Sequence, residues 1–221
     1  MTTTSTLLVT GFEPWGAHAE NPSALIARAL DGAAIGGSAR VHGAVLPVSR
    51  SAMPGRLQEL IDETRPALVL CTGLAAGYLG LAAERVAVNV QDFPEADNDG
   101  ASPHDEAIVE DGPYGLPATI DVKAVRAAWR EHGIPGYVSD SAGTYLCNMA
   151  MYVALTLTAP DGIPAGFIHV PQLAAQAAQA DRLVPSMSLE TMVDGVRVAL
   201  EAAWSAASTE ANAPQLAQSR R

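Results

Sequence analysis

Short apolar runs alternate along the chain with segments in which apolar residues recur every three or four positions. The apolar runs predict buried strands at residues 7–11, 41–48, 67–73, 136–138 and 165–171. The helical spacing predicts helices over residues 24–30, 56–65, 121–132, 149–155 and 187–204. Strands that alternate with helices in this way predict a three-layer α/β/α sandwich around a mostly parallel sheet.

Turn and capping residues mark the ends of these predicted elements. Asn21 and Asp121 precede helical segments and are good N-caps, and Pro22 is tolerated at a first helical position. Residues 91–114 are rich in Asp, Glu, Gly and Pro, have no clear period, and predict a long loop of the kind that is often functional. We expect one domain over residues 1–204 and a frayed or disordered tail over residues 205–221.

Composition narrows the class of protein. The chain has 221 residues, of which 48% are hydrophobic, and this suits one large core. With 13 basic and 24 acidic residues its net charge is −11, which argues against binding to nucleic acid or an anionic membrane. No apolar stretch reaches the ~18 residues of a membrane span. The first residues lack the basic segment of a signal peptide, and there are only two cysteines, so the expected location is the cytoplasm.

Cys147 is the main candidate for chemistry. It follows a small, polar segment and precedes a helix that is apolar on every side, so it should lie near a helix N-terminus. The N–H groups and dipole of such a terminus favour a thiolate and can hold an oxyanion. The alternative is a buried cysteine that acts as a small hydrophobe. Cys71 lies inside an apolar strand run, where that second interpretation is favoured.

Other candidate functional residues each have an alternative interpretation in which their role is only structural. Phe12 and Trp15 follow the first strand and would either form the wall of an apolar binding site or cover the end of the sheet. Glu84 would be a surface residue paired with Arg85 unless it has a partner elsewhere. His169 ends the last apolar strand, where a lone histidine is more often structural than catalytic. The histidines show no metal-ligand spacing with cysteines or carboxylates.

Several short motifs together resemble one family of proteins. Any one of them is weak evidence, but they occur in the order of the family and cover the chain to about Ala203. They are VTGFEPWG at 9–16 followed by Asn21-Pro22, ERVAVN at 84–89, DNDG at 97–100, SAGTYLCN at 141–148, GFIHVP at 166–171 and PSMS at 185–188. The chain thus resembles the pyroglutamyl peptidase I, or pyrrolidone-carboxylate peptidase, family of cysteine peptidases.

The resemblance implies a function. It implies a single catalytic α/β/α domain that removes an N-terminal pyroglutamyl (5-oxoprolyl) residue from peptides in the cytoplasm. It implies a thioester acyl-enzyme, no metal or organic cofactor, and assembly as a homotetramer. The alternative kept open is a binding protein on the same fold that holds pyroglutamyl or related lactam ligands with little or no turnover.

The resemblance also implies roles for particular residues. Cys147 would be the nucleophile, His169 the general base and acid, and Glu84 the carboxylate that orients the imidazole. By the same resemblance the lactam ring would lie in a slot lined by Phe12, Trp15, Tyr145 and Leu146. Two positions depart from the family, because Tyr78 and Pro94 stand where many bacterial members have arginine.

Overall fold

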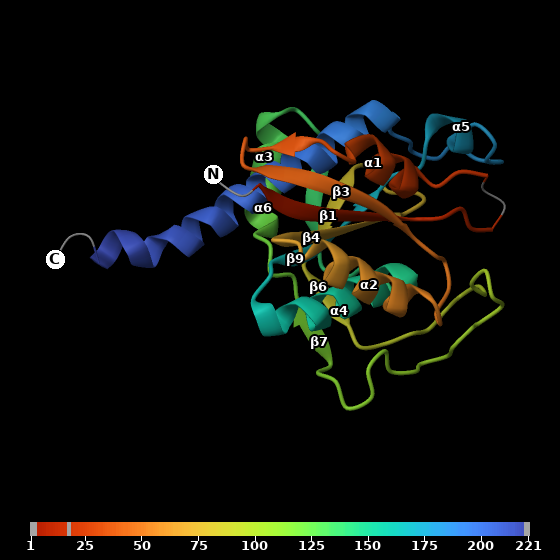
Figure 1. Cartoon of the computed structure of the whole chain (residues 1–221). Coiled ribbons are helices and arrows are strands. Elements are labelled where there is room, and N and C mark those ends of the chain that lie inside the picture. Colours follow the sequence, from red (N-terminus) through yellow and green to blue (C-terminus); the bar gives the residue numbers. More distant parts are fainter. Residues whose placement is uncertain (1–3, 17–18, 219–221) are drawn as a thin grey trace.

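A seven-stranded sheet forms the centre of the molecule. The computed structural model describes residues 4–16 and 19–218, and the strands of its main sheet lie in the order β2-β3-β1-β4-β9-β5-β8 (Figure 1). Their bounds are β1 Ser5–Phe12, β2 Ala34–Ile35, β3 Ala39–Leu46, β4 Leu68–Leu74, β5 Leu81–Glu84, β8 Gly136–Ser139 and β9 Ala165–Val170. A separate pair, β6 Val86–Val88 and β7 Gly115–Pro117, is antiparallel.

Most neighbouring strands in this sheet are parallel. β1 is parallel to both β3 and β4, and β4 is parallel to β9. The direction reverses between β9 and β5, which are antiparallel, while β5 and β8 run parallel to each other. The short β2 is antiparallel to β3. The predicted, mostly parallel sheet is therefore confirmed.

Helices cover both faces of the sheet. The elements are α1 Pro22–Leu30, α2 Met53–Thr64, α3 Val122–Glu131, α4 Leu146–Thr158, the 3-10 turn η1 Ala159–Asp161, α5 Ala174–Ala177 and α6 Leu189–Gln218. α1, α3 and α6 pack on one face, and α2 and α4 pack on the other (Figure 1). The three-layer α/β/α prediction is confirmed.

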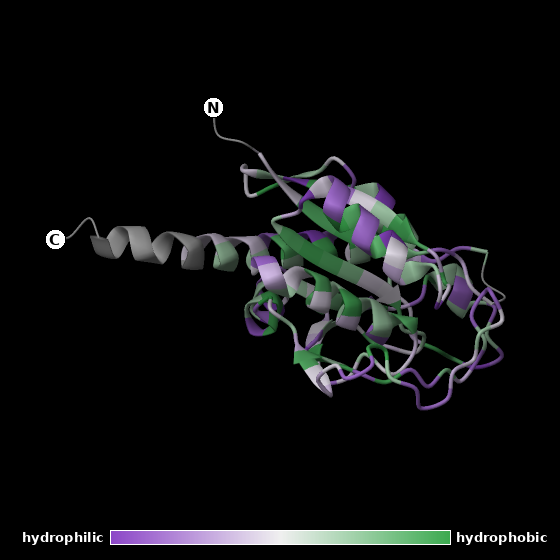
Figure 2. Ribbon diagram, turned by 60° about the horizontal axis from the view of Figure 1, so that its bottom comes forward, coloured by the Kyte–Doolittle hydropathy of each residue, from purple (hydrophilic) through white to green (hydrophobic). Residues whose placement is uncertain are grey.

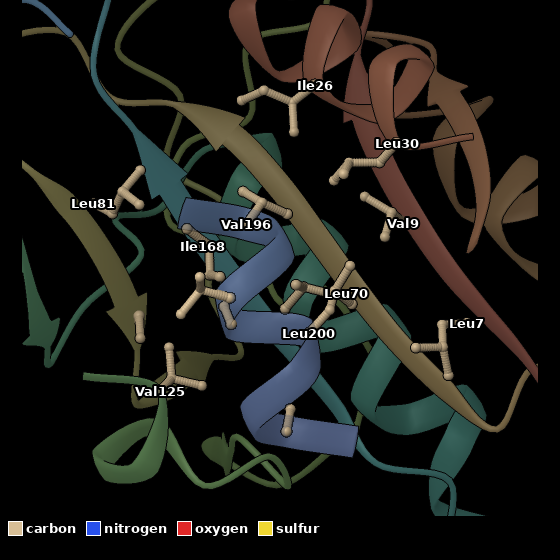
Figure 3. Packing of buried hydrophobic residues seen from close by; sticks show 14 of the residues in the cluster. Leu7, Val9, Ile26, Leu30, Leu70, Leu81, Val125, Ile168, Val196 and Leu200 are labelled. Carbon is tan, nitrogen blue, oxygen red and sulfur yellow. The ribbon is translucent and has the colours of Figure 1, made fainter. Parts of the chain in front are cut away.

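Each strand contributes side chains to two cores, one on each face of the sheet. Val9, Leu70 and Ile168 point to the α6 side, where Val196 and Leu200 pack against them (Figure 3). Leu8, Val69 and Phe167 point to the α4 side. Figure 2 shows the result, hydrophobic strands between helices with hydrophilic outer faces. Burying one such side chain stabilises the fold by about 1.5–3 kcal/mol.

The predicted caps begin their helices. The Asn21 side chain accepts a hydrogen bond from the backbone N–H of Ser23 at 3.1 Å and opens α1. The Asp121 carboxylate accepts from the N–H groups of Lys123 and Ala124 and opens α3. These caps satisfy backbone donors that have no acceptor within the helix.

The structure differs from the sequence prediction at several ends and short elements. α2 begins at Met53 rather than at residue 56, because Pro54 lies in its first turn, where proline is tolerated. β2, β5, β7 and α5 are two to four residues long, too short to show a period. α6 continues as helix to Gln218, through most of the segment predicted as a frayed tail. Alanine, the strongest helix former, is frequent there. Residues 219–221 lie outside the described residues.

The predicted long loop joins β6 to β7 and is fixed by polar side chains. Asn89 accepts from the N–H groups of Ile108 and Val109. The Asp97 carboxylate accepts from three backbone N–H groups, including that of Arg50 at 2.6 Å. These bonds give the loop a defined path beside the ends of β1 and β3. None of the helices described has a stretch both long and apolar enough to cross a lipid bilayer.

Candidate active site

Three of the predicted side chains come together on the face of the sheet that α4 covers. Cys147 is the second residue of α4, His169 lies on β9, and Glu84 is the last residue of β5. β5 is antiparallel to β9 with Ala82 opposite His169. Glu84 is therefore a diagonal neighbour of His169 on the same face, and a long side chain can reach across this diagonal.

Glu84 and His169 form a buried pair. Nδ1 of His169 lies 2.8 Å from Oε1 of Glu84, and both side chains are buried. A carboxylate can only accept, so Nδ1 must carry the proton, and Nε2 is the nitrogen left for a reaction partner. The second oxygen, Oε2, has no hydrogen-bond partner among the described residues. The surface pairing of Glu84 with Arg85 is wrong, because Arg85 pairs with Asp140 at 2.5 Å.

The surroundings of His169 favour the imidazolium. Burial lowers its pKa, but the charge of Cys147, a hydrogen bond with that side chain and the Glu84 carboxylate together outweigh burial. They raise the pKa of His169 from 6.5 to about 9. At neutral pH the site therefore holds a positive imidazolium between the sulfur of Cys147 and the carboxylate of Glu84.

Gly73 makes room for the nucleophilic sulfur, and sequence reasoning did not identify it. It lies at the end of β4 and is the partner of His169 in the neighbouring strand. A Cβ added there would lie 2.7 Å from Sγ of Cys147 and 2.8 Å from the Phe167 ring. Both distances are shorter than real Cβ contacts. A glycine near the end of a buried strand is the signal that marks this position.

The first turn of α4 has backbone N–H groups free to bind a ligand, and a buried asparagine holds the turn in place. Tyr145 is the N-cap residue but makes no side-chain capping bond, so the first N–H groups of the helix, including that of Cys147, remain available as donors. Asn148 is buried and donates to the carbonyls of Val88 and Val90, at 2.8 and 3.0 Å. It also accepts from the Val88 N–H. Asn148 thus fixes the helix start against β6.

A small apolar pocket opens beside Cys147. Its volume is about 170 Å³, below the roughly 300–1,000 Å³ of pockets for drug-sized ligands. The structure places all four predicted binding residues in its wall, together with Cys147. The lining residues are Phe12, Trp15, Glu20, Asn21, Val48, Leu74, Ala76, Tyr145, Leu146 and Cys147. The pocket therefore suits a small and mainly apolar group next to the thiol.

Two aromatic side chains of the pocket wall are tied to the long loop. The rings of Trp15 and Tyr145 are 5.2 Å apart. Both donate to the carbonyl of Ala96, from the indole N–H at 3.1 Å and from the phenol at 3.4 Å. The Phe93 ring packs edge-on to Tyr145 at 4.4 Å, whereas Pro94 next to it is exposed. The loop thus sets the position of the aromatic wall.

The second cysteine lies in the core. Cys71 on β4 is fully buried, and burial raises the pKa of its thiol to about 11. Both cysteines are free thiols. Among residues 4–16 and 19–218 there is no group of three or more His, Cys, Asp or Glu side chains placed to hold a metal ion.

The fold and site together define a class of protein. A thiol at a helix start, an imidazole and a buried carboxylate on an α/β sandwich are the parts of a cysteine-type hydrolase. A family model described as pyroglutamyl peptidase matches residues 5–206, and the chain belongs to that family.

Known relatives and solved structures agree with this assignment. The chain is 45% identical over 203 residues to the pyrrolidone-carboxylate peptidase of Deinococcus radiodurans, covering 89% of this chain and 93% of that protein. It is 41% identical to the enzyme of the same name from Pyrococcus furiosus, over 89% of this chain and 97% of that protein. The solved pyrrolidone carboxyl peptidase of Thermococcus litoralis superposes with a TM-score of 0.91 at 38% identity, over 94% of this chain and 96% of that one.

Proposed function

We propose that this chain is a cysteine peptidase that removes an N-terminal pyroglutamyl residue from peptides. The observation that carries the proposal is the Cys147–His169–Glu84 set, whose Cys147 lines a small apolar pocket. The relatives that share this chain's family are named as pyrrolidone-carboxylate peptidases. No observation favours the alternative of a binding protein without turnover.

The first half of the reaction forms a thioester. His169 holds the proton of Cys147, and Glu84 stabilises the imidazolium through Nδ1. The thiolate attacks the carbonyl carbon that joins pyroglutamate to the next residue, and the carbonyl oxygen becomes an oxyanion. The Cys147 N–H in the first turn of α4 is a suitable donor to this oxygen. His169 gives its proton to the amide nitrogen, the C–N bond breaks, and the shortened peptide leaves.

The second half restores the enzyme. His169 is now neutral at Nε2 and takes a proton from a water molecule as that water attacks the thioester carbonyl. The resulting tetrahedral intermediate collapses, the C–S bond breaks, and free pyroglutamate leaves. The sulfur departs as a thiolate beside the imidazolium, which is the state in which the cycle began.

Specificity follows from the chemistry of the pocket. The pyroglutamyl lactam is a small ring without charge, so an apolar slot is a suitable receptor. Phe12 and Trp15 form one wall, and Tyr145 and Leu146 lie at the start of the helix that carries the nucleophile. A free N-terminal glutamate or glutamine carries an ammonium group, and burying that charge in such a slot is unfavourable.

The direct test is turnover of a pyroglutamyl-arylamide by the purified chain. We expect release of the arylamine, complete loss in Cys147→Ala, and near wild-type rates in Cys71→Ala, the matched control at the buried thiol. Binding of pyroglutamate with no release of arylamine by the folded wild-type chain would instead support the lactam-binding alternative.

Two further properties belong to the proposal. We expect a cytoplasmic protein, because both cysteines are free thiols. We also expect a homotetramer, by family resemblance. Large apolar side chains that remain exposed, Leu79 at 84% and Leu183 at 102%, are candidates for subunit contacts. Light scattering on the purified chain measures the assembly directly.

A further inference from the structure

The catalytic histidine lies in a row of residues that crosses the sheet. Gly73 on β4 pairs with His169 on β9, His169 pairs with Ala82 on β5, and Ala82 pairs with Tyr137 on β8. Paired residues on neighbouring strands point to the same face, and strands lie about 4.8 Å apart, so His169 and Tyr137 are separated by roughly 10 Å. Only the methyl group of Ala82 lies between them in the row.

A side chain from a loop occupies this space. The Tyr78 ring comes from the connection between β4 and β5 and lies 5.8 Å from the His169 ring, edge-on, and 5.9 Å from the Tyr137 ring. We propose that Tyr78 is a positioning residue, whose ring fills the space above Ala82, holds the His169 imidazole in place and shields the His169–Glu84 pair from water. This inference rests on the proposed function, because it assigns a role within that site.

The position of Tyr78 is fixed from both ends. Its side chain lies beside those of Tyr137 and Ser139. Its backbone N–H donates to the Ala75 carbonyl at 3.2 Å, across a turn in which Gly77 has φ +90°. A ring that is flanked by two side chains and held at its backbone can resist displacement by the imidazole that it contacts.

The electrostatic surroundings agree with a shielding role. Burial and the nearby negative charge of Glu84 both raise the pKa of Tyr78, so the phenol stays neutral where His169 is charged. Tyr78 does not line the pocket beside Cys147. Its removal should therefore affect the chemical step and leave substrate binding almost unchanged.

The test compares Tyr78→Ala, Tyr78→Phe and Tyr114→Ala. Tyr114 is 81% exposed, so Tyr114→Ala is a control that removes a tyrosine side chain far from the packed interior. For Tyr78→Ala we expect kcat to fall between about tenfold and a hundredfold, since small displacements of a catalytic group are costly, with KM within about twofold. Tyr78→Phe keeps the ring and should recover most of the loss. Tyr114→Ala should match wild type.

The pH dependence separates positioning from a general loss of structure. Water admitted to the pair weakens every effect that moves the His169 pKa, so its value should fall from about 9 toward the ordinary 6.5. The titration of His169, followed by NMR of its imidazole ring, should therefore move to lower pH in Tyr78→Ala. This titration needs no peptide substrate, so it tests Tyr78 even if the pyroglutamyl activity proves absent.

Three results would overturn the inference. One is a Tyr78→Ala protein that behaves like Tyr114→Ala. Another is a raised KM with unchanged kcat, which would make Tyr78 a binding residue. The third is a lower kcat with an unmoved pH profile in folded protein, which would make its role merely structural. If Tyr78→Ala does not fold, Tyr78→Leu, which also lacks the ring, replaces it in the test, with a lower kcat and the same direction of pH shift expected.

Discussion

Replacing Glu84 with glutamine tests how the site sets the charge of His169. The amide oxygen of glutamine can still accept the hydrogen bond from Nδ1, so the substitution removes the charge and keeps the shape. The pKa of His169 is raised from 6.5 to about 9, and each unit corresponds to about 1.4 kcal/mol. The thiol and the carboxylate together therefore stabilise the imidazolium by roughly 3 kcal/mol beyond the cost of its burial.

The charge of Glu84 is one of the causes that raise the pKa of His169, after the charge and hydrogen bond of Cys147. In Glu84→Gln this cause is lost, so the His169 pKa should fall from its value of about 9. The imidazolium exists below this pKa and is lost as the pH rises through it. The variant should therefore lose activity at a lower pH than wild type.

The assay is the pH dependence of kcat/KM with a pyroglutamyl-arylamide, together with the titration of His169 followed by NMR of its imidazole ring. We expect the alkaline limb to move to lower pH and kcat/KM at neutral pH to fall about tenfold. Glu63→Gln, at an exposed position on α2, controls for the change in net charge. An unmoved alkaline limb, or a loss as complete as that of Cys147→Ala in folded protein, would refute this account of Glu84.

Further predictions concern the thiols, the glycine and the pocket wall. Limited iodoacetamide at neutral pH should modify Cys147 well before Cys71, whose burial raises its pKa to about 11; peptide mapping that finds Cys71 modified first would contradict this. Gly73→Ala should lower kcat at least about tenfold, because its Cβ would meet the sulfur at 2.7 Å. The matched control is Gly55→Ala on α2, where an added Cβ meets no atom within 4 Å. This variant should keep wild-type activity and melt at the same or a slightly higher temperature. Trp15→Ala should raise KM about tenfold or more, through lost apolar contact, and an unchanged KM would remove Trp15 from the binding site.

Much of the layered fold can be predicted from periodicity alone. The runs that became β1, β4 and β9 are apolar on both faces, which is typical of strands covered by helices on both sides. The segment that became α4 is apolar all round, and ten of its residues are buried. Asn21 and Asp121 mark helix starts because their side chains satisfy local backbone donors. These signals are local, so one sequence is enough to see them.

The contacts within the site depend on register and cannot be predicted in this way. Glu84 precedes an alternating stretch, and nothing nearby in the sequence indicates that it reaches a residue 85 positions away. That contact exists because β5 is antiparallel to β9 with Ala82 opposite His169. The parallel register of β4 with β9 places Gly73 opposite His169 and next to the thiol. The family resemblance supplied the partners because it carries information about the fold that periodicity lacks.

The Glu84–His169 pair also shows where the fold gives up stability for chemistry. Both side chains are buried, and Oε2 of Glu84 has no hydrogen-bond partner among the described residues. A buried acceptor without a partner costs roughly 1–3 kcal/mol of folding free energy, and more when it is charged. A buried ion pair often contributes less to stability than apolar residues of the same volume would. Stability alone would therefore favour an apolar pair at these positions. A carboxylate that keeps Nδ1 protonated and the imidazole charged is instead what a thiolate at Cys147 requires.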